Sequence, residues 1–246
     1  LVQNLKNSCD EFIAPRRERL DDIVFGDTKE DCSELLDYEG NSVIGLRAFL
    51  LPQTEELFEI RSAKDNDLAP IEDMKRRVFY GVRPCDITAL KLMRKFFLEN
   101  FVDLPYKKKL ENSIFVALAC TKQCNSKSFC YEMGTGPVAE GDFDLELIPV
   151  NRGFIAESGS KKGSEIIRRN RKLFTKASPK DEKEVKGITE AFKKKAKKRI
   201  DYEKLFKIMK EDSVNESIWD DIGLRCVRCS GCITLCPTCS CFSVAD

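Results

Sequence analysis

Apolar and polar residues alternate in blocks through the middle of the chain, and these blocks predict strands and helices in turn. RRVFYGV (76–82) is a β-rich apolar run, and SIFVALAC (113–120) is a continuous apolar run of buried-strand length. Between them, apolar residues recur every three or four positions from Ile87 to Phe97, which is typical of an amphipathic helix with Asp86 as its N-cap. This order of elements predicts a parallel β–α–β unit.

Outside this unit the pattern is less regular and predicts further short elements. They are a strand at 12–15, a helix-like stretch at 31–36, two strands within 144–158 and a helix at 164–175. Residues 179–211 are charged and helical. The lysine-rich run 193–199 within them is typical of a solvated helix face, and a basic contact to an acidic partner is the alternative interpretation.

Composition limits the kinds of protein this chain can be. The 246 residues can hold one large domain or two modest ones, and a hydrophobic share of 42% is enough for a core. The net charge of +1 argues against nucleic-acid binding, and no apolar run approaches the roughly 18 residues of a membrane-spanning helix. Histidine is absent, which removes imidazole acid–base chemistry and histidine-ligated metals. With no signal peptide visible, we expect a soluble, cytoplasmic protein whose thiols stay reduced.

The strongest chemical signal is the group of six cysteines near the C-terminal end. Cys226, Cys229 and Cys232 are spaced C-x2-C-x2-C, and Cys236 follows after three residues with Pro237 behind it. Bacterial ferredoxins hold 4Fe-4S cubanes with this C-x2-C-x2-C-x3-C-P run, in which the fourth cysteine ligates a neighbouring cluster. The two-residue gaps let one tight loop direct three thiolates at three corners of a cubane. The pattern therefore predicts an electron-transfer protein.

A zinc site is the main competing interpretation of this tail. Cys239 and Cys241 are further candidate metal ligands there, and residues 226–229 and 236–239 are two C-x2-C pairs. Only six residues separate these pairs, whereas zinc ribbons usually leave about 15–20. A thioredoxin-type motif at 236–239 would need a preceding strand, which the pattern does not predict. Twelve cysteines in 246 residues are also too few for a disulfide scaffold.

A second set of four cysteines surrounds the predicted β–α–β unit. Cys85 follows the first strand, Cys120 ends the second, and Cys124 and Cys130 lie in the loop after it. Because the carboxyl ends of parallel strands meet at the edge where ligands bind, these thiols could converge on a second iron–sulfur cluster. Asp86 could supply an oxygen ligand if one thiol fails to reach. The alternative is that all four are ordinary buried side chains, although the loop CTKQCNSKSFC is polar for that.

Three other features carry weaker signals. Cys9 and Cys32 have no partners at a useful spacing and are interpreted as structural. The glycine-rich segment MGTGP (133–137) lacks the context of a phosphate loop, so it predicts a turn where backbone approaches a cofactor or a neighbouring domain. Trp219, just before the cysteine tail, is expected to pack a small domain against its neighbour.

These patterns together predict three parts of the chain. Residues 1–176 form an α/β N-terminal domain with a second possible cluster site, residues 177–217 a charged helical linker, and residues 218–246 a ferredoxin-like 4Fe-4S segment. A two-cluster ferredoxin needs another cysteine run to complete the ligand sets, and none follows Cys236. We therefore expect that the chain is a fragment of a longer polypeptide and that the iron–sulfur segment is truncated.

Several stretches of the chain are distinctive: GVRPCDITALKLM (81–93), VALAC with SFCYEMGTGP (116–137), CVRCSGCITLCPTCSCF (226–242) and, nearer the start, FIAP and AFLLPQTEELF (48–58). Together they resemble the beta subunits of sulfhydrogenases and the related A subunit of anaerobic sulfite reductase. The first stretch also resembles the beta subunit of deazaflavin-reducing hydrogenases. The resemblance covers nearly the whole chain. It implies cluster ligands at Cys226, Cys229, Cys232 and Cys236, and site positions in the N-terminal domain at Cys85, Cys120 and Cys130.

The resemblance implies an iron–sulfur subunit of a hetero-oligomeric, anaerobic oxidoreductase. Such a subunit relays electrons between a flavoprotein subunit of diaphorase type and a catalytic redox subunit, and it binds no organic substrate itself. Two departures from the family stand out: the second ferredoxin cysteine run is absent, and Ser128-Phe129-Cys130 replaces the usual T-C-F-C. The competing functions are a zinc-stabilised interaction module and a self-contained flavin reductase, and the second lacks a phosphate-binding motif.

Overall fold

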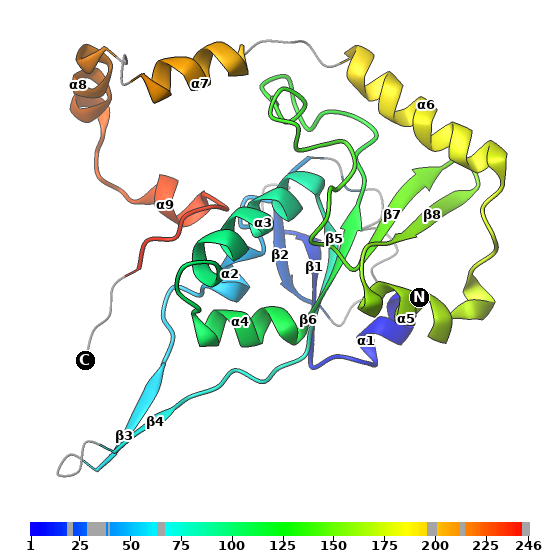
Figure 1. The fold of residues 1–246 in the computed structure, drawn as a ribbon, viewed down its shortest axis with the longest axis horizontal. Helices are drawn as coiled ribbons and strands as arrows, with labels where there is room; N and C mark the ends of the chain where they lie inside the picture. The colour runs from blue at the N-terminus through cyan, green and yellow to red at the C-terminus, as the bar shows by residue number, and fades with distance from the viewer. Residues whose placement is uncertain are drawn as a thin grey trace.

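A six-stranded sheet forms the centre of the protein in this computed structural model, which describes residues 1–18, 22–28, 38, 40–62, 67–195, 201–211 and 215–242 (Figure 1). The strand order is β2-β1-β5-β6-β7-β8. Neighbours among β1, β5, β6 and β7 run parallel, whereas β2 and β8 pair antiparallel at the two edges. The strands are β1 (Glu11–Arg17), β2 (Ile23–Asp27), β5 (Arg77–Val82), β6 (Ser113–Leu118), β7 (Leu145–Val150) and β8 (Gly153–Ser158). The expected α/β class is confirmed.

The predicted β–α–β unit is present, but two helices rather than one connect its strands. Strands β5 and β6 are parallel neighbours joined by α3 (Pro84–Leu98) and α4 (Leu104–Glu111). The expected N-cap at Asp86 is wrong: Arg83 occupies the N-cap position without a side-chain cap, because Pro84 is favoured in the first helical turn and starts the helix earlier. The unpredicted α4 has its own cap, since the Asp103 carboxylate accepts the Tyr106 N–H at 2.8 Å.

Helices cover both faces of the sheet because alternate strand residues point to opposite sides. On one face Phe79 and Phe115 stack at 5.1 Å between ring centroids and pack with residues of α2 (Arg47–Leu50), α3 and α4. On the other face Tyr80 and Val116 pack toward α1 (Val2–Lys6) and α5 (Lys161–Arg169). Both faces of the parallel strands are therefore buried, as their continuous apolar runs require.

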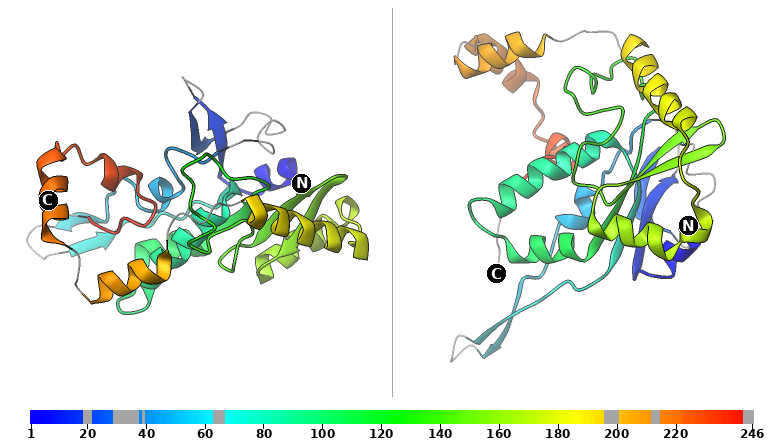
Figure 2. Two further views of the ribbon diagram at one scale, coloured as in Figure 1. Left: turned by 90° about the horizontal axis from the view of Figure 1, so that it is seen from above. Right: turned by 45° about the vertical axis from the view of Figure 1, so that its right-hand side comes forward.

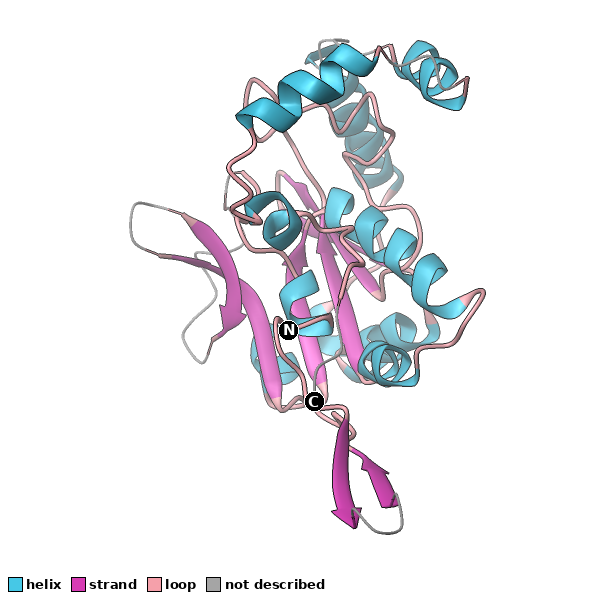
Figure 3. Cartoon of the chain, turned by 90° about the vertical axis from the view of Figure 1, so that its left-hand side faces the viewer, coloured by secondary structure: helices cyan, strands magenta, loops and turns pink. Residues whose placement is uncertain are grey.

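Two parts of the chain project from this body. The antiparallel hairpin of β3 (Phe58–Ser62) and β4 (Asp67–Pro70) extends away from the sheet (Figure 3). Helices α7 (Tyr202–Lys210) and α8 (Glu216–Arg225) lie apart from it as well, and neither has a buried residue (Figure 2). Helix α6 (Pro179–Lys195), which precedes them in the chain, packs on β7 and buries Phe192. None of the described helices has the length and apolar content needed to cross a bilayer.

Some sequence expectations need correction, and others lie outside the described residues. The helix expected at 164–175 begins at Lys161, because the Ser160 hydroxyl caps it through the Gly163 N–H, and it ends at Arg169. The packing role expected for Trp219 is wrong: its side chain is 60% exposed, since α8 contacts no core. The helix-like stretch at 31–36, and Cys32 within it, lie outside the described residues.

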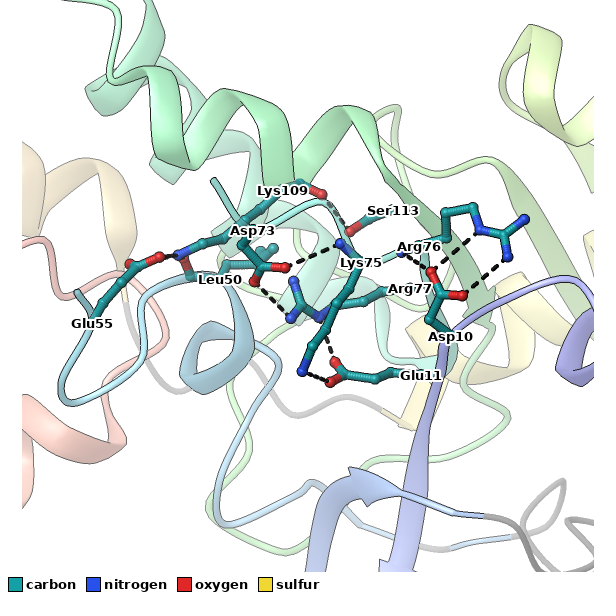
Figure 4. A network of polar contacts seen from close by, with 10 residues as sticks. All are labelled: Asp10, Glu11, Leu50, Glu55, Asp73, Lys75, Arg76, Arg77, Lys109 and Ser113. Atoms are coloured by element: carbon teal, nitrogen blue, oxygen red, sulfur yellow. Dashed lines mark hydrogen bonds and ion pairs between the residues drawn. The ribbon is translucent and has the colours of Figure 1, made fainter. Parts of the chain in front are cut away.

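A network of ion pairs lies at the amino ends of the parallel strands (Figure 4). The nearly buried Arg77 guanidinium contacts Glu11 through Nε and Asp73 through Nη2, each at 2.7 Å. Lys109 of α4 donates to Glu55 at 2.6 Å and to the Leu50 carbonyl at 3.1 Å. These contacts hold the loop before β5 and the segment after α2 against the sheet, at the edge opposite to the cysteines that follow β5 and β6.

Glu146 on β7 gives the fold a pH-dependent stability. Its side chain is 1% exposed, and Oε1 accepts the Ala139 N–H at 2.8 Å. Burial raises the pKa of Glu146 from its usual 4.5 to about 7, with the Ala139 hydrogen bond acting against this and the Glu157 charge adding to it. Because the folded-state pKa is the higher one, the stability contributed by the protonated carboxyl is complete below about pH 4.5 and is lost as the pH rises through about 7.

Replacing Glu146 by glutamine should therefore stabilise the protein at high pH. We expect the free energy of unfolding of E146Q to exceed that of the unaltered protein by about 3 kcal/mol at pH 8 and by less than about 1 kcal/mol at pH 5. Urea unfolding at both pH values measures this difference. E190Q, at an exposed position of α6, is the control and should change little at either pH. A gain in E146Q that does not depend on pH would contradict the role of the carboxyl.

Candidate metal centres

The four N-terminal cysteines gather at the carboxyl edge of two adjacent parallel strands. Cys85 lies in the first turn of α3, directly after β5, and Cys120 lies two residues beyond the end of β6. Cys124 and Cys130 come from the loop that follows. The charges of Cys120, Cys124 and Cys130 all act on the Cys85 thiol, so the four sulfur atoms lie within electrostatic reach of one another. The four cysteines therefore lie at one edge of the sheet, as the order of strands suggested, and their role as one ligand set stays a prediction.

The surroundings of these thiols suit metal ligands better than reactive nucleophiles. Burial raises the pKa of all four thiols. The pKa of Cys120 rises to about 12, because the Cys124 and Cys130 charges add to burial while the Arg83 charge opposes it. A protonated thiol is a poor nucleophile, so cysteine catalysis at neutral pH is disfavoured. A positively charged iron core would supply the compensation that buried thiolates need. The donor set therefore fits an iron–sulfur cluster.

Arg83 is a site residue that the sequence reasoning missed. Its guanidinium is 8% exposed and lies over the Tyr38 ring at 3.9 Å from the centroid. It donates to the Tyr38 carbonyl and, at 3.5 Å, to the Ala119 carbonyl, and it hydrogen-bonds the Cys120 thiol, which lowers the pKa of that group. A fixed positive charge therefore lies beside the thiol set. Its position in the sequence, immediately before Pro84-Cys85, could have indicated that Arg83 lies near the candidate ligand Cys85.

The glycine-rich segment 133–137 adjoins the same thiols. The Pro137 carbonyl accepts the Cys120 N–H at 2.8 Å, and Thr135 donates to the Cys130 carbonyl through its N–H at 2.9 Å and its hydroxyl at 3.2 Å. The segment therefore contacts the backbone of two of the candidate ligands. The approach to a cofactor or a neighbouring domain that its glycines suggested stays a prediction.

Asp86 is buried next to Cys85, with Oδ2 shielded from solvent and without a hydrogen-bond partner. Burial raises the pKa of Asp86 to about 6, while the Arg83 charge lowers it. Asp86 also lines a small cavity, which Pro237 of the cysteine tail lines as well. Asp86 is therefore close to Cys85 and to one residue of the tail. A role as oxygen ligand stays a prediction.

The C-terminal cysteines lie on a sharply turned segment after α8. Cys226 ends that helix, and Cys232 lies in the following helix α9 (Gly231–Leu235). Arg228 and Ser230, in the gaps between the cysteines, have φ values of 56° and 60°. This left-handed backbone is costly for residues other than glycine and is found mainly at functional sites. The exposed thiols here are those of Cys226, Cys229, Cys232 and Cys241, whereas Cys236 and Cys239 are half-buried.

The last turn of this segment contacts the α/β body. Arg47 Nε of α2 donates to the Cys239 carbonyl at 2.6 Å, and Pro237 lies against α2 and α3 (Figure 1). The Thr238 hydroxyl lies 3.3 Å from the Cys236 sulfur, and this hydrogen bond, with the Arg47 charge nearby, lowers the pKa of Cys236. The cysteine tail is therefore attached to the N-terminal domain through this turn.

The choice between a cluster and a single ion rests on residue types and spacing. Within the described parts of the chain, no three histidine, cysteine, aspartate or glutamate side chains are placed to hold one metal ion. The eleven cysteines there are all free thiols. The ferredoxin-like character of residues 218–246 and the ligand roles of individual cysteines accordingly stay predictions.

Comparison with known proteins gives one informative match. The sulfhydrogenase 2 subunit beta of Pyrococcus furiosus is 28% identical to this chain over 211 residues, which are 86% of this chain and 61% of that protein. The chain thus spans less than two thirds of the length of this curated relative. No protein-family model and no solved structure matches. The match supports the sulfhydrogenase beta subunit family, to which the cysteine motifs of this chain had already pointed.

Proposed function

We propose that this chain is an iron–sulfur electron-transfer subunit of an oxidoreductase complex. It would relay electrons between a flavoprotein subunit and a catalytic subunit of hydrogenase or sulfite reductase type. The observation that carries the proposal is the gathering of four thiols at the carboxyl edge of β5 and β6, beside a tail with ferredoxin cysteine spacing. The relative's name, a sulfhydrogenase subunit, supports the same role.

Each cysteine set would hold a 4Fe-4S cluster in its own way. In the tail, Cys226, Cys229 and Cys232 would bind three corners of one cubane, and the left-handed residues between them keep that loop tight. In the N-terminal domain the ligands would be Cys85, Cys120, Cys124 and Cys130. A bound cubane supplies a one-electron couple whose potential depends on charge, hydrogen bonds to sulfur and exposure.

Nearby arginine side chains would raise the reduction potentials of these clusters. Arg83 places a buried positive charge beside Cys120 and would favour the reduced, more negative state of a cluster there. Arg225 and Arg228 lie beside the tail cysteines in the sequence and would act in the same way. Arg225, however, pairs with Asp221 at 2.8 Å, which offsets its charge, so Arg228 is the better candidate of the two.

The proposal includes assembly with other subunits, since the relative is named as a subunit beta. The projecting hairpin is consistent with this. Phe58 and Ile60 of β3 and Leu68 of β4 are exposed, and the register places all three on one face. A two-stranded hairpin with a bare apolar face is marginally stable alone in water, so this surface suits contact with a partner.

Metal analysis of the anaerobically purified chain tests this function. We expect iron and acid-labile sulfide in equal amounts, zinc well below one equivalent, and an electron paramagnetic resonance signal after dithionite reduction. Stoichiometric zinc without acid-labile sulfide would contradict the electron-transfer role and favour the zinc-stabilised interaction module. The comparison with known proteins does not favour that alternative.

A further inference from the structure

The hydrogen bond between Arg47 and Cys239 joins two segments that are 192 residues apart in the sequence. Arg47 begins the short helix α2, and its Nε donates to the carbonyl of Cys239 at 2.6 Å. The contact is partly buried. Among the hydrogen bonds given above, it is the one that ties the cysteine tail directly to the α/β body.

An apolar contact accompanies this bond. Pro237 lines a small cavity between α2 and α3, together with Leu46, Leu50, Leu90, Met93 and Asp86. The rest of its ring stays exposed, so the contact buries little apolar surface. The turn at 236–239 therefore touches the body through one hydrogen bond and one small apolar contact, and the hydrogen bond from Arg47 is the stronger of the two.

This contact places the tail near the helix that carries Cys85. Pro237 directly follows Cys236 in the chain, and Asp86 directly follows Cys85. Because Pro237 and Asp86 line the same cavity, the 236–239 turn lies near the start of α3. The Arg47 guanidinium reaches the carbonyl of Cys239, three residues after Cys236.

We propose that Arg47 is a positioning residue that holds the Cys236–Cys239 turn against α2 and the start of α3, and that its guanidinium raises the reduction potential of the tail cluster. The proposal rests on the proposed function, since it assumes that the cysteine tail binds a cluster. Arginine keeps its charge at every accessible pH. A fixed positive charge at this range favours the more negative, reduced state.

Three variants of the anaerobically reconstituted chain test this role, with two readouts for each. R47Q removes the charge and the strong donor, R47K keeps the charge but not the planar Nε donor, and R61Q removes a charge from the exposed hairpin as a matched control. The readouts are a redox titration followed by electron paramagnetic resonance and the hydrogen-exchange rate of the peptide covering residues 236–241.

At a fixed ambient potential, we expect the ratio of reduced to oxidised cluster to fall roughly tenfold in R47Q. This corresponds to about 59 mV for a one-electron couple. Exchange at 236–241 should be faster in both Arg47 variants, while R47K should keep a potential near that of the unaltered chain. R61Q should match the unaltered chain in both readouts.

A potential in R47Q equal to that of the unaltered chain overturns the proposal, whatever its exchange rate. If R47Q binds too little iron to titrate, R47K decides: faster exchange at 236–241 with a retained potential supports the role, and unchanged exchange overturns it. These results differ from a failure of the proposed function, in which the unaltered chain itself would contain no acid-labile sulfide.

Discussion

A chain in which Cys120 is replaced by serine should contain about half of the iron and acid-labile sulfide of the unaltered chain after anaerobic reconstitution. Cys120 lies among the other three N-terminal thiols, and both Arg83 and the Pro137 carbonyl hold it in place. A serine hydroxyl ionises far less readily than a thiol and binds iron weakly, so one of two clusters should be lost. Colorimetric iron and sulfide analysis measures the effect.

The matched control for this experiment is Cys9→Ser. Cys9 is also half-buried, but its sulfur donates to the Lys6 carbonyl at 3.5 Å, and none of the four N-terminal thiols acts on it. C9S should keep its full iron content. Equal iron in C120S, C9S and the unaltered chain would show that the N-terminal thiols hold no cluster.

Replacing Lys109 by alanine should lower the free energy of unfolding by about 3–5 kcal/mol, which is the usual cost of breaking a buried ion pair. The Lys109 side chain is 2% exposed, and its ammonium group donates to Glu55 and the Leu50 carbonyl. Alanine would leave both acceptors without their donor and would open a cavity between α2 and α4. Urea unfolding followed by far-ultraviolet circular dichroism measures the change.

Lys107, on the same helix, provides the comparison for this loss of stability. Its ammonium group is 46% exposed and lies 3.8 Å from Glu111, so K107A should cost less than about 1 kcal/mol. The two variants share helix propensity and net charge, and they differ in burial. A cost for K109A no larger than that for K107A would contradict a structural role for the buried pair.

Elements with a strong periodic pattern could be predicted from the sequence. The runs at 76–82 and 113–120 became β5 and β6, and the spacing from Ile87 to Phe97 became α3. These segments are read correctly because a buried strand and an amphipathic helix each impose a period on their own residues. The ends of the helices were less predictable. Helix α3 begins at Pro84 and α5 directly after its N-cap Ser160, in each case before the first residue that the apolar pattern indicated.

The amino-acid sequence alone determined the α/β class, the ferredoxin-type cysteine run, and the expectation that Cys85 and Cys120 meet at one edge of the sheet. Those features depend on local periodicity, ligand spacing and the common direction of parallel strands. Only the tertiary structure decided that Arg83 and Tyr38 border the thiols and that Arg47 holds the cysteine tail. Such contacts join residues that no local pattern links, because they depend on how distant segments pack around the carboxyl edge of the sheet.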